Sequence, residues 1–203
     1  MTVKNLFFVD VDTQRDFMLS TGALSVPGAE RMVPKLRRLF EFARRNEITI
    51  LSTMDAHVPD DPEFKQFPAH CVQRTEGQRK LDDTLLPRPL ILPNKPVDRN
   101  LMDAVKKHQQ IIVEKQSLDP FDNPVLERLM RVLPPHAIVF GVATEYCVKL
   151  ACLGIRRLGV PVAVVTDAIR ALSPKTEKEA LEEMRRAGVE FITMETLMGA
   201  GAD

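Results

Sequence analysis

The sequence predicts an α/β protein whose largely parallel sheet is covered by helices on both faces. Two observations lead to this prediction. Short apolar runs alternate along the chain with longer segments whose apolar residues recur at helical spacing. The runs at 5–11 and 137–142 are almost unbroken, which is typical of strands buried on both faces of a parallel sheet.

The composition excludes several functional classes. The chain has 203 residues, 28 basic and 28 acidic side chains, and a formal net charge of +0. This length suits a single domain over residues 1–203, and the balanced charge gives no reason to bind nucleic acid or an anionic membrane. The N-terminus leads straight into the first apolar run, and no stretch approaches the roughly 18 apolar residues of a membrane span. We therefore expect a cytoplasmic protein.

Three cysteines without a CxxC pair indicate neither a disulfide framework nor a thiolate zinc site.

Six apolar runs are predicted as strands. They lie at 5–11, 48–54, 110–114, 137–142, 160–166 and 189–193, and the short run at 89–92 is a candidate for a further strand at a sheet edge. Helices are predicted between them at 29–46, 101–108, 124–132, 144–155 and 176–187. Pro124 suits the first position of its helix, and Gly188 suits the C-cap of the last one. The segment 55–96 is long, and unstructured loops of this length inside a domain are usually functional.

The run at 137–142 leads into a helix that carries Cys147 in its first turn. Gly141 allows a tight backbone turn, and Thr144 is an N-cap type of residue. The positive end of the helix dipole and the free backbone N–H groups favour a thiolate, so we expect a lowered pKa for Cys147. The alternative is that Cys147 is a small buried hydrophobic residue, which is the common state of cysteine.

Three other predicted strands also end in residues suited to chemistry. Asp12 follows the first strand, the sequence Asp55-Ala-His57 follows the second, and Lys115 follows the run at 110–114. Because the carboxyl ends of parallel strands meet at one edge of a sheet, we expect these residues and Cys147 to form one site. As alternatives, Asp12 could be a turn or cap residue, and Lys115 could be solvated.

This set of residues can perform nucleophilic chemistry. Asp12 can take the thiol proton of Cys147 and return it to a leaving amine. Lys115 can keep that carboxylate ionised and favour the thiolate. The turn before the helix can offer backbone N–H groups to an oxyanion.

Asp55, His57 and His70 are candidate metal ligands. Residues i and i+2 of an extended chain point to the same side, so Asp55 and His57 can converge. His70 follows in a proline-rich loop. One carboxylate and two imidazoles suit zinc, iron or manganese, and three protein ligands leave positions open for water or substrate. The alternative is that all three are polar loop residues facing solvent.

Taken together, these motifs resemble the isochorismatase-like cysteine hydrolases, and most closely their nicotinamidase/pyrazinamidase branch. The motifs are, in order, Asp12-Thr-Gln-Arg-Asp-Phe17, Asp55-Ala-His57, Pro68-Ala-His-Cys-Val72, Lys115 and Gly141-Val-Ala-Thr-Glu-Tyr-Cys147. The resemblance covers about residues 5–195. The motif Gly141–Cys147 is highly specific for this family. The two motifs that contain Asp55, His57 and His70 separate nicotinamidase-type members from metal-free relatives.

The resemblance implies a three-layer α/β/α fold with a six-stranded, mostly parallel sheet. It implies a Cys147–Asp12–Lys115 triad that hydrolyses a small carboxamide, nicotinamide or a pyrazinamide-like amide, to the acid and ammonia through a thioester. The backbone amides of Ala143 and Cys147 would form the oxyanion hole, next to a cis peptide bond that precedes Ala143. We also expect a homo-oligomer, which is common for such folds.

The resemblance also implies a divalent metal ion, zinc with iron or manganese as alternatives. It would be held by Asp55, His57 and His70 and would bind the pyridine nitrogen of the substrate. The expected substrate-binding residues are Phe17, Phe67 and Val142.

The sequence departs from the branch pattern in two places. Phe67 stands where nicotinamidases usually carry Trp. The usual aromatic–serine segment after the lysine reads Ser117-Leu-Asp-Pro-Phe-Asp-Asn-Pro124, in which only Phe121 matches. Two alternatives therefore stay open, namely a family amidase for another small carboxamide and a non-catalytic small-molecule-binding domain on this fold.

Overall fold

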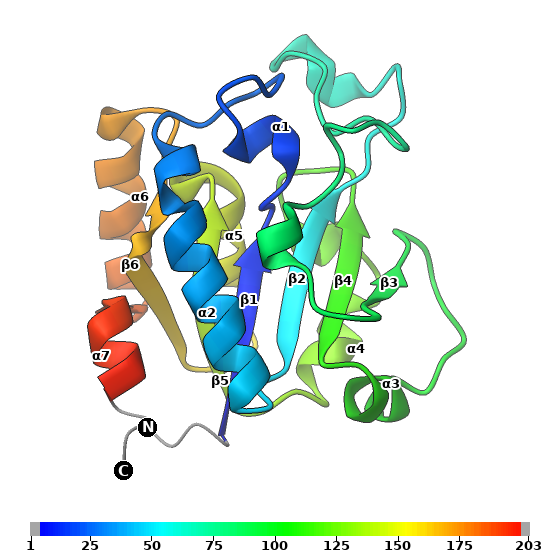
Figure 1. Ribbon diagram of the computed structural model, residues 1–203, viewed down its shortest axis with the longest axis vertical. Coiled ribbons are helices and arrows are strands. Elements are labelled where there is room, and N and C mark those ends of the chain that lie inside the picture. The colour runs from blue at the N-terminus through cyan, green and yellow to red at the C-terminus, as the bar shows by residue number, and fades with distance from the viewer. Residues whose placement is uncertain (1–4, 200–203) are drawn as a thin grey trace.

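Seven parallel strands form the centre of the protein in a computed structural model that describes residues 5–199 (Figure 1). Their order in the sheet is β3-β4-β2-β1-β5-β6-β7. The strands are β1 (Leu6–Val11), β2 (Ile50–Asp55), β3 (Leu90–Leu92), β4 (Gln110–Lys115), β5 (His136–Val142), β6 (Val162–Arg170) and β7 (Glu190–Ile192). The sheet has seven strands where six were expected, because the three-residue strand β3 joins it at the edge beside β4. The first and last four residues of the predicted domain 1–203 lie outside the described residues.

Helices cover both faces of the sheet, which confirms the predicted α/β architecture. They are α1 (Arg15–Met18), α2 (Val33–Arg45), α3 (Leu101–Lys107), α4 (Leu126–Met130), α5 (Lys149–Arg157), α6 (Pro174–Arg186) and α7 (Met194–Gly199). Shorter turns are η2 (Ala29–Met32), η3 (Pro62–Lys65), η4 (Asp82–Thr84), η5 (Pro120–Asp122) and the π-helix η6 (Thr144–Val148). Within the described part of the chain, no helix is long and apolar enough to cross a membrane.

Alternating side chains of the strands supply two cores. Leu6 and Phe8 of β1 pack with residues of α2 and α7, which lie in front of the sheet in Figure 1. Phe7, Val9 and Val11 point to the opposite face and pack with residues of α3, α4, α5 and α6. Because successive residues of a strand point to opposite faces, a nearly unbroken apolar run was needed to fill both cores.

One helix boundary differs from the prediction in a way that matters for the site. The helix expected at 124–132 begins only at Leu126, so Pro124 precedes it instead of occupying its first position. The side chain of Asn123 accepts a hydrogen bond from the backbone N–H of Val125 at 2.8 Å and starts this helix. The residues before it form η5, which packs against α5 beside the site.

The first part of the long segment 55–96, with η3, lies over the carboxyl ends of the strands at the top of Figure 1, and its later part runs down to β3 at the edge of the sheet. Its regular structure consists only of η3, η4 and β3 among the residues that are described. The polar residues that end β1, β2 and β4 therefore open into a space that this segment covers.

Candidate active site

Asp12 lies where β1 leaves the sheet, and its carboxylate points into the site. The residue is fully buried and adopts a left-handed backbone conformation with φ of 47°. The Thr53 hydroxyl donates to its Oδ1 at 2.6 Å, and its Oδ2 lies 3.0 Å from Lys115 Nζ. Asp12 is therefore not a solvent-facing turn residue.

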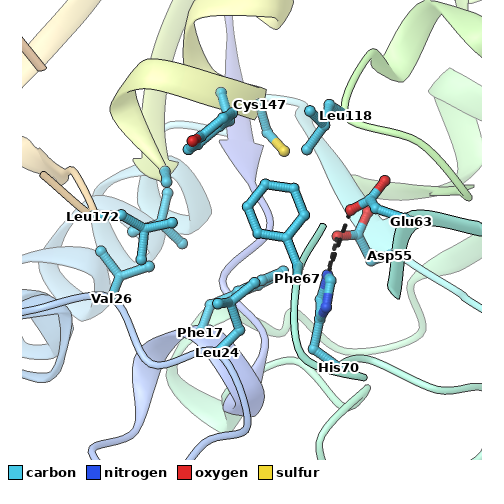
Figure 2. A pocket seen from close by; sticks show the side chains of 13 residues that line it. Phe17, Leu24, Val26, Asp55, Glu63, Phe67, His70, Leu118, Cys147 and Leu172 are labelled. Carbon is cyan, nitrogen blue, oxygen red and sulfur yellow. Dashed lines mark ion pairs between the residues drawn. The ribbon is translucent and has the colours of Figure 1, made fainter. Parts of the chain in front are cut away.

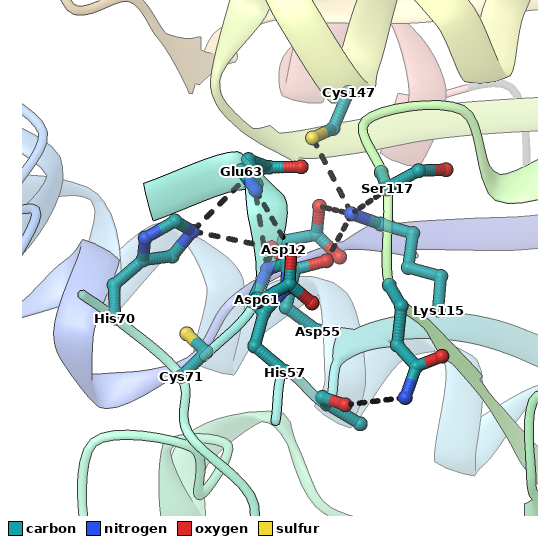
Figure 3. A network of polar contacts seen from close by, with 12 residues as sticks. Asp12, Asp55, His57, Asp61, Glu63, His70, Cys71, Lys115, Ser117 and Cys147 are labelled. Carbon is teal, nitrogen blue, oxygen red and sulfur yellow. Dashed lines mark hydrogen bonds and ion pairs between the residues drawn. The ribbon is translucent and has the colours of Figure 1, made fainter. Parts of the chain in front are cut away.

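Lys115 is the last residue of β4, and its ammonium group joins two sets of residues (Figure 3). Nζ forms ion pairs with Asp12 and Asp55, and it lies 3.5 Å from Cys147 Sγ. It also donates to the backbone carbonyl of Ser117 at 3.1 Å. The side chain is only 1% exposed, so the alternative of a solvated lysine is wrong.

The loop from β5 to η6 delivers Cys147 to this cluster. Gly141 has φ of 121°, and a Cβ atom on it would lie 2.1 Å from the carbonyl oxygen of Val11, so only glycine lets the two strands run this close. The peptide bond between Val142 and Ala143 is cis, as the resemblance implied. Ala143, and not Thr144, is the N-cap of the π-helix that carries Cys147. The prediction of a Thr144 cap is therefore wrong.

The electrostatics of the triad differ from the expectation of a low-pKa thiol. Burial raises the pKa of Cys147 well above its usual value, and Lys115 opposes this only in part because Asp12 and Asp55 add negative charge. Burial likewise raises the pKa of Asp12 against the effect of Lys115. Burial alone would lower the pKa of Lys115, but its two carboxylate partners outweigh this and raise it well above the usual range. These shifts favour the thiol form of Cys147, make the carboxylate of Asp12 more basic than usual and favour the charged form of Lys115.

Asp55, His57 and His70 meet as the sequence predicted, and all three are buried. Asp55 Oδ2 lies 3.7 Å from His57 Nε2 and 3.8 Å from His70 Nε2. The other ring nitrogens are engaged, because His57 Nδ1 pairs with Asp61 Oδ2 at 2.9 Å and His70 Nδ1 donates to the Pro68 carbonyl at 2.7 Å. His57 Nε2 is buried without a hydrogen-bond partner among the described residues. These groups could hold a divalent cation, because imidazole ligands present one nitrogen to a metal while the other is hydrogen-bonded.

Glu63 is a further candidate ligand that the sequence did not reveal. Its Oε1 lies 3.9 Å from His57 Nε2 and 3.7 Å from His70 Nε2. It sits on η3, whose preceding Asp61 accepts a hydrogen bond from the Glu63 backbone N–H at 2.9 Å. The sequence Asp61-Pro62 is a helix-start signature and was the available signal for this turn.

Metal affinity is expected to rise with pH, because binding must displace a proton from His57. Burial alone would lower the pKa of His57, but the carboxylates of Asp55, Asp61 and Glu63 outweigh it and raise the pKa to about 9. Below that pH the metal-free ring is charged, and a metal ion needs its neutral form. We expect the association constant for Zn²⁺ to increase about tenfold per pH unit between pH 6 and 8. Calorimetry in buffers of different ionisation enthalpy measures the released proton, and an affinity independent of pH would contradict this prediction.

One pocket reaches both groups of residues, because Cys147 of the triad and Asp55 and His70 of the metal-ligand cluster line it, while Asp12, His57 and Lys115 lie behind this lining (Figure 2). Phe17, Phe67, Val142, Ala143 and Cys147, all expected at the site from the sequence, line it together with Asp55 and His70. Sequence reasoning missed the remaining lining residues, which are Leu24, Val26, Glu63, Leu118, Tyr146 and Leu172. Most of them are apolar loop residues for which the sequence offers no signal.

The two segments that depart from the nicotinamidase pattern, around Phe67 and Phe121, contribute differently to the pocket. The rings of Phe67 and Tyr146 meet edge to face at 5.5 Å and both line the pocket. Phe121 does not line it, because its ring packs against Gly154 of α5, where a Cβ atom would lie 2.3 Å from the ring. Leu118 faces the pocket from this segment instead.

Comparisons with known proteins agree with this geometry. The isochorismatase domain family matches residues 6–196. The nicotinamidase of Escherichia coli (strain K12) is 27% identical over 208 residues, covering 91% of this chain and 92% of that protein. The nicotinamidase/pyrazinamidase of Mycobacterium tuberculosis is 27% identical over 193 residues, covering 90% and 95%. The zinc-bound pyrazinamidase of Pyrococcus horikoshii superimposes with a TM-score of 0.78 at 27% identity, covering 94% of this chain and 99% of that one. The chain therefore belongs to the isochorismatase domain family.

Proposed function

We propose that the protein is a metal-dependent cysteine amidohydrolase that converts nicotinamide, or a close heteroaromatic amide, to the acid and ammonia. The observation that carries this proposal is Lys115, which contacts Asp12 and Cys147 on one side and the candidate metal ligand Asp55 on the other. A single pocket thus offers both a nucleophile and a place to orient a ring. The relatives from E. coli and M. tuberculosis, named as nicotinamidases, support amide hydrolysis.

The first half of the reaction follows from the position of Asp12 beside the thiol. Asp12 accepts the proton of Cys147 as Sγ attacks the amide carbon. The backbone N–H groups of Ala143 and Cys147 stabilise the resulting oxyanion. Asp12 then gives the proton to the amide nitrogen, ammonia leaves, and a thioester with Cys147 remains.

The second half uses the same groups with water as the nucleophile. Asp12 takes a proton from water while the oxygen attacks the thioester carbon, and the proton returns to the sulfur of Cys147 as the acid leaves. Lys115 stays charged throughout and holds the carboxylate of Asp12 in place. The apolar pocket wall limits the water that competes with substrate.

Asp55, His57 and His70, with Glu63 beside them, would hold the metal ion, and this donor set suits zinc. When bound, the ion supplies a Lewis-acidic site for the pyridine nitrogen. Phe17 lines the pocket beside His70, and the centroids of the two rings lie 5.2 Å apart. The Phe17 ring would therefore contact the aromatic ring of a substrate placed near His70.

Comparing nicotinamide with benzamide tests this proposal. Benzamide has the same shape but lacks the ring nitrogen, so it can use the triad and not the metal. We expect kcat/KM for benzamide to be lower by about 100-fold or more, since correct placement of the carboxamide is what the ring nitrogen provides. Equal values for the two amides would contradict a substrate-orienting metal.

A second candidate is hydrolysis of another small carboxamide by the same machinery. Phe67 and Leu118 favour it, because they replace larger aromatic groups expected in nicotinamidases and change the shape of the pocket. A kcat/KM for some other amide far above that for nicotinamide would support this candidate and leave the proposed chemistry intact.

A further inference from the structure

A buried ion pair lies beneath the active site and takes no part in the chemistry described above. Asp10 of β1 and Lys80 of the segment 55–96 approach to 2.9 Å, and their side chains are 0% and 1% exposed. The Asp10 carboxylate also accepts hydrogen bonds from the hydroxyls of Ser52 and Thr13, each at 2.8 Å. Apolar residues in the place of a buried ion pair are often equally stable. A contribution to stability alone is therefore a weak explanation for this pair.

The pair lies where the hydrogen-bond ladder between β1 and β2 is interrupted. The two strands are in register up to Asp10 and Ser52, and Phe8 N–H donates to the Thr49 carbonyl at 3.0 Å. In a regular parallel ladder the donors recur every second residue, so the Asp12 N–H would donate to the Thr53 carbonyl. It donates instead to the Thr53 hydroxyl, at 3.3 Å. The Thr53 carbonyl accepts from Lys80 Nζ at 3.2 Å.

Lys80 thus takes the place of the Asp12 amide in the ladder. A buried carbonyl that loses its donor is costly, so the regular ladder would otherwise hold Asp12 in an extended conformation. With that carbonyl satisfied, Asp12 turns away with φ of 47° and directs its carboxylate to Lys115. The Thr53 hydroxyl, which accepts the Asp12 backbone N–H, donates in turn to Asp12 Oδ1 at 2.6 Å and fixes the orientation of this carboxylate.

We propose that Lys80, held in place by Asp10, is a positioning residue for the catalytic carboxylate of Asp12. This inference rests on the proposed role of Asp12 as the base. The side chain of Lys80 touches neither the pocket lining nor the metal-ligand cluster in the contacts that the described residues make. Its effect should therefore appear in the turnover step and in the reactivity of Cys147, with little effect on substrate or metal binding.

The test replaces Lys80→Met, which preserves length and removes the donor, and uses four readouts on the zinc-loaded protein. They are kcat and KM for nicotinamide, zinc content, and the rate of Cys147 alkylation by iodoacetamide at fixed pH. We expect kcat and the alkylation rate to fall together by about 10- to 100-fold, at or below the lower end of the effect of losing a general base, because the carboxylate is displaced and not removed. KM and zinc content should stay within about threefold of the wild-type values.

A second variant keeps the test decisive if the first fails to fold. Asp10→Asn/Lys80→Met removes both charges and should fold, since the Asn side chain can still bond both hydroxyls, and should show the same loss of kcat. Val162→Ala, at the amino end of β6 and two strands away from β1, serves as a control with a lowered Tm and an unchanged kcat. Full activity and full alkylation rate in a folded Lys80 variant would overturn the inference. If the wild type does not hydrolyse nicotinamide, the proposed function fails while the alkylation comparison still decides on Lys80.

Discussion

The variant Cys147→Ala is expected to lose amide hydrolysis, with kcat lowered by about 10⁴-fold or more. Removal of a nucleophile from a covalent mechanism costs this much because no other group can form the intermediate. Lys115 and Asp12 would remain in place and could offer only weak electrostatic help. Ammonia release from nicotinamide at saturating concentration measures the effect.

Cys152→Ala is the matched control for this variant. Cys152 lies on α5 immediately after the π-helix, is fully buried, and belongs to the apolar core. Its loss creates a small cavity, so we expect a destabilisation of about 1 kcal/mol and a kcat within about twofold of the wild-type value. A Cys147→Ala protein that keeps more than a small fraction of its activity would refute the covalent mechanism.

The fold was largely predictable because its strands are buried on both faces. Short apolar runs such as 5–11 and 137–142, separated by segments of helical periodicity, are typical of buried parallel strands and of few other structures. The edges were less predictable. Strand β3 has only three residues in a partly exposed pattern, so its pairing with β4 depends on backbone contacts that the short apolar run at 89–92 cannot reveal.

The meeting of Asp12, Lys115 and Cys147 was predictable from topology alone, because each ends or follows a parallel strand. The protonation of Cys147 was not. A helix N-terminus favours a thiolate only when the charge stays solvated, and here burial among carboxylates dominates. Topology could not reveal Glu63 or Lys80 either. Glu63 reaches the metal-ligand cluster and Lys80 reaches Asp10, both from the segment 55–96, whose path is set by side-chain contacts instead of by periodicity.

The second large effect concerns the metal-ligand cluster. Under the proposed function, removing the metal ion, or the candidate ligand His70 by His70→Ala, is expected to lower nicotinamide hydrolysis by about 100-fold or more, because the ring nitrogen then has no partner. His136→Ala is the matched control, since this residue begins β5 at the opposite edge of the sheet. We expect His136→Ala to keep both its zinc and its activity.

Ammonia release from nicotinamide by the metal-replete protein, measured before chelation, after chelation and after Zn²⁺ is added back, tests the central claim most directly. We predict release that is lost with the metal ion and returns with it, while Cys147 remains open to alkylation throughout. Release that continues unchanged in the chelated protein would contradict the role of Asp55, His57 and His70. No release from the metal-replete protein would contradict nicotinamide as the substrate.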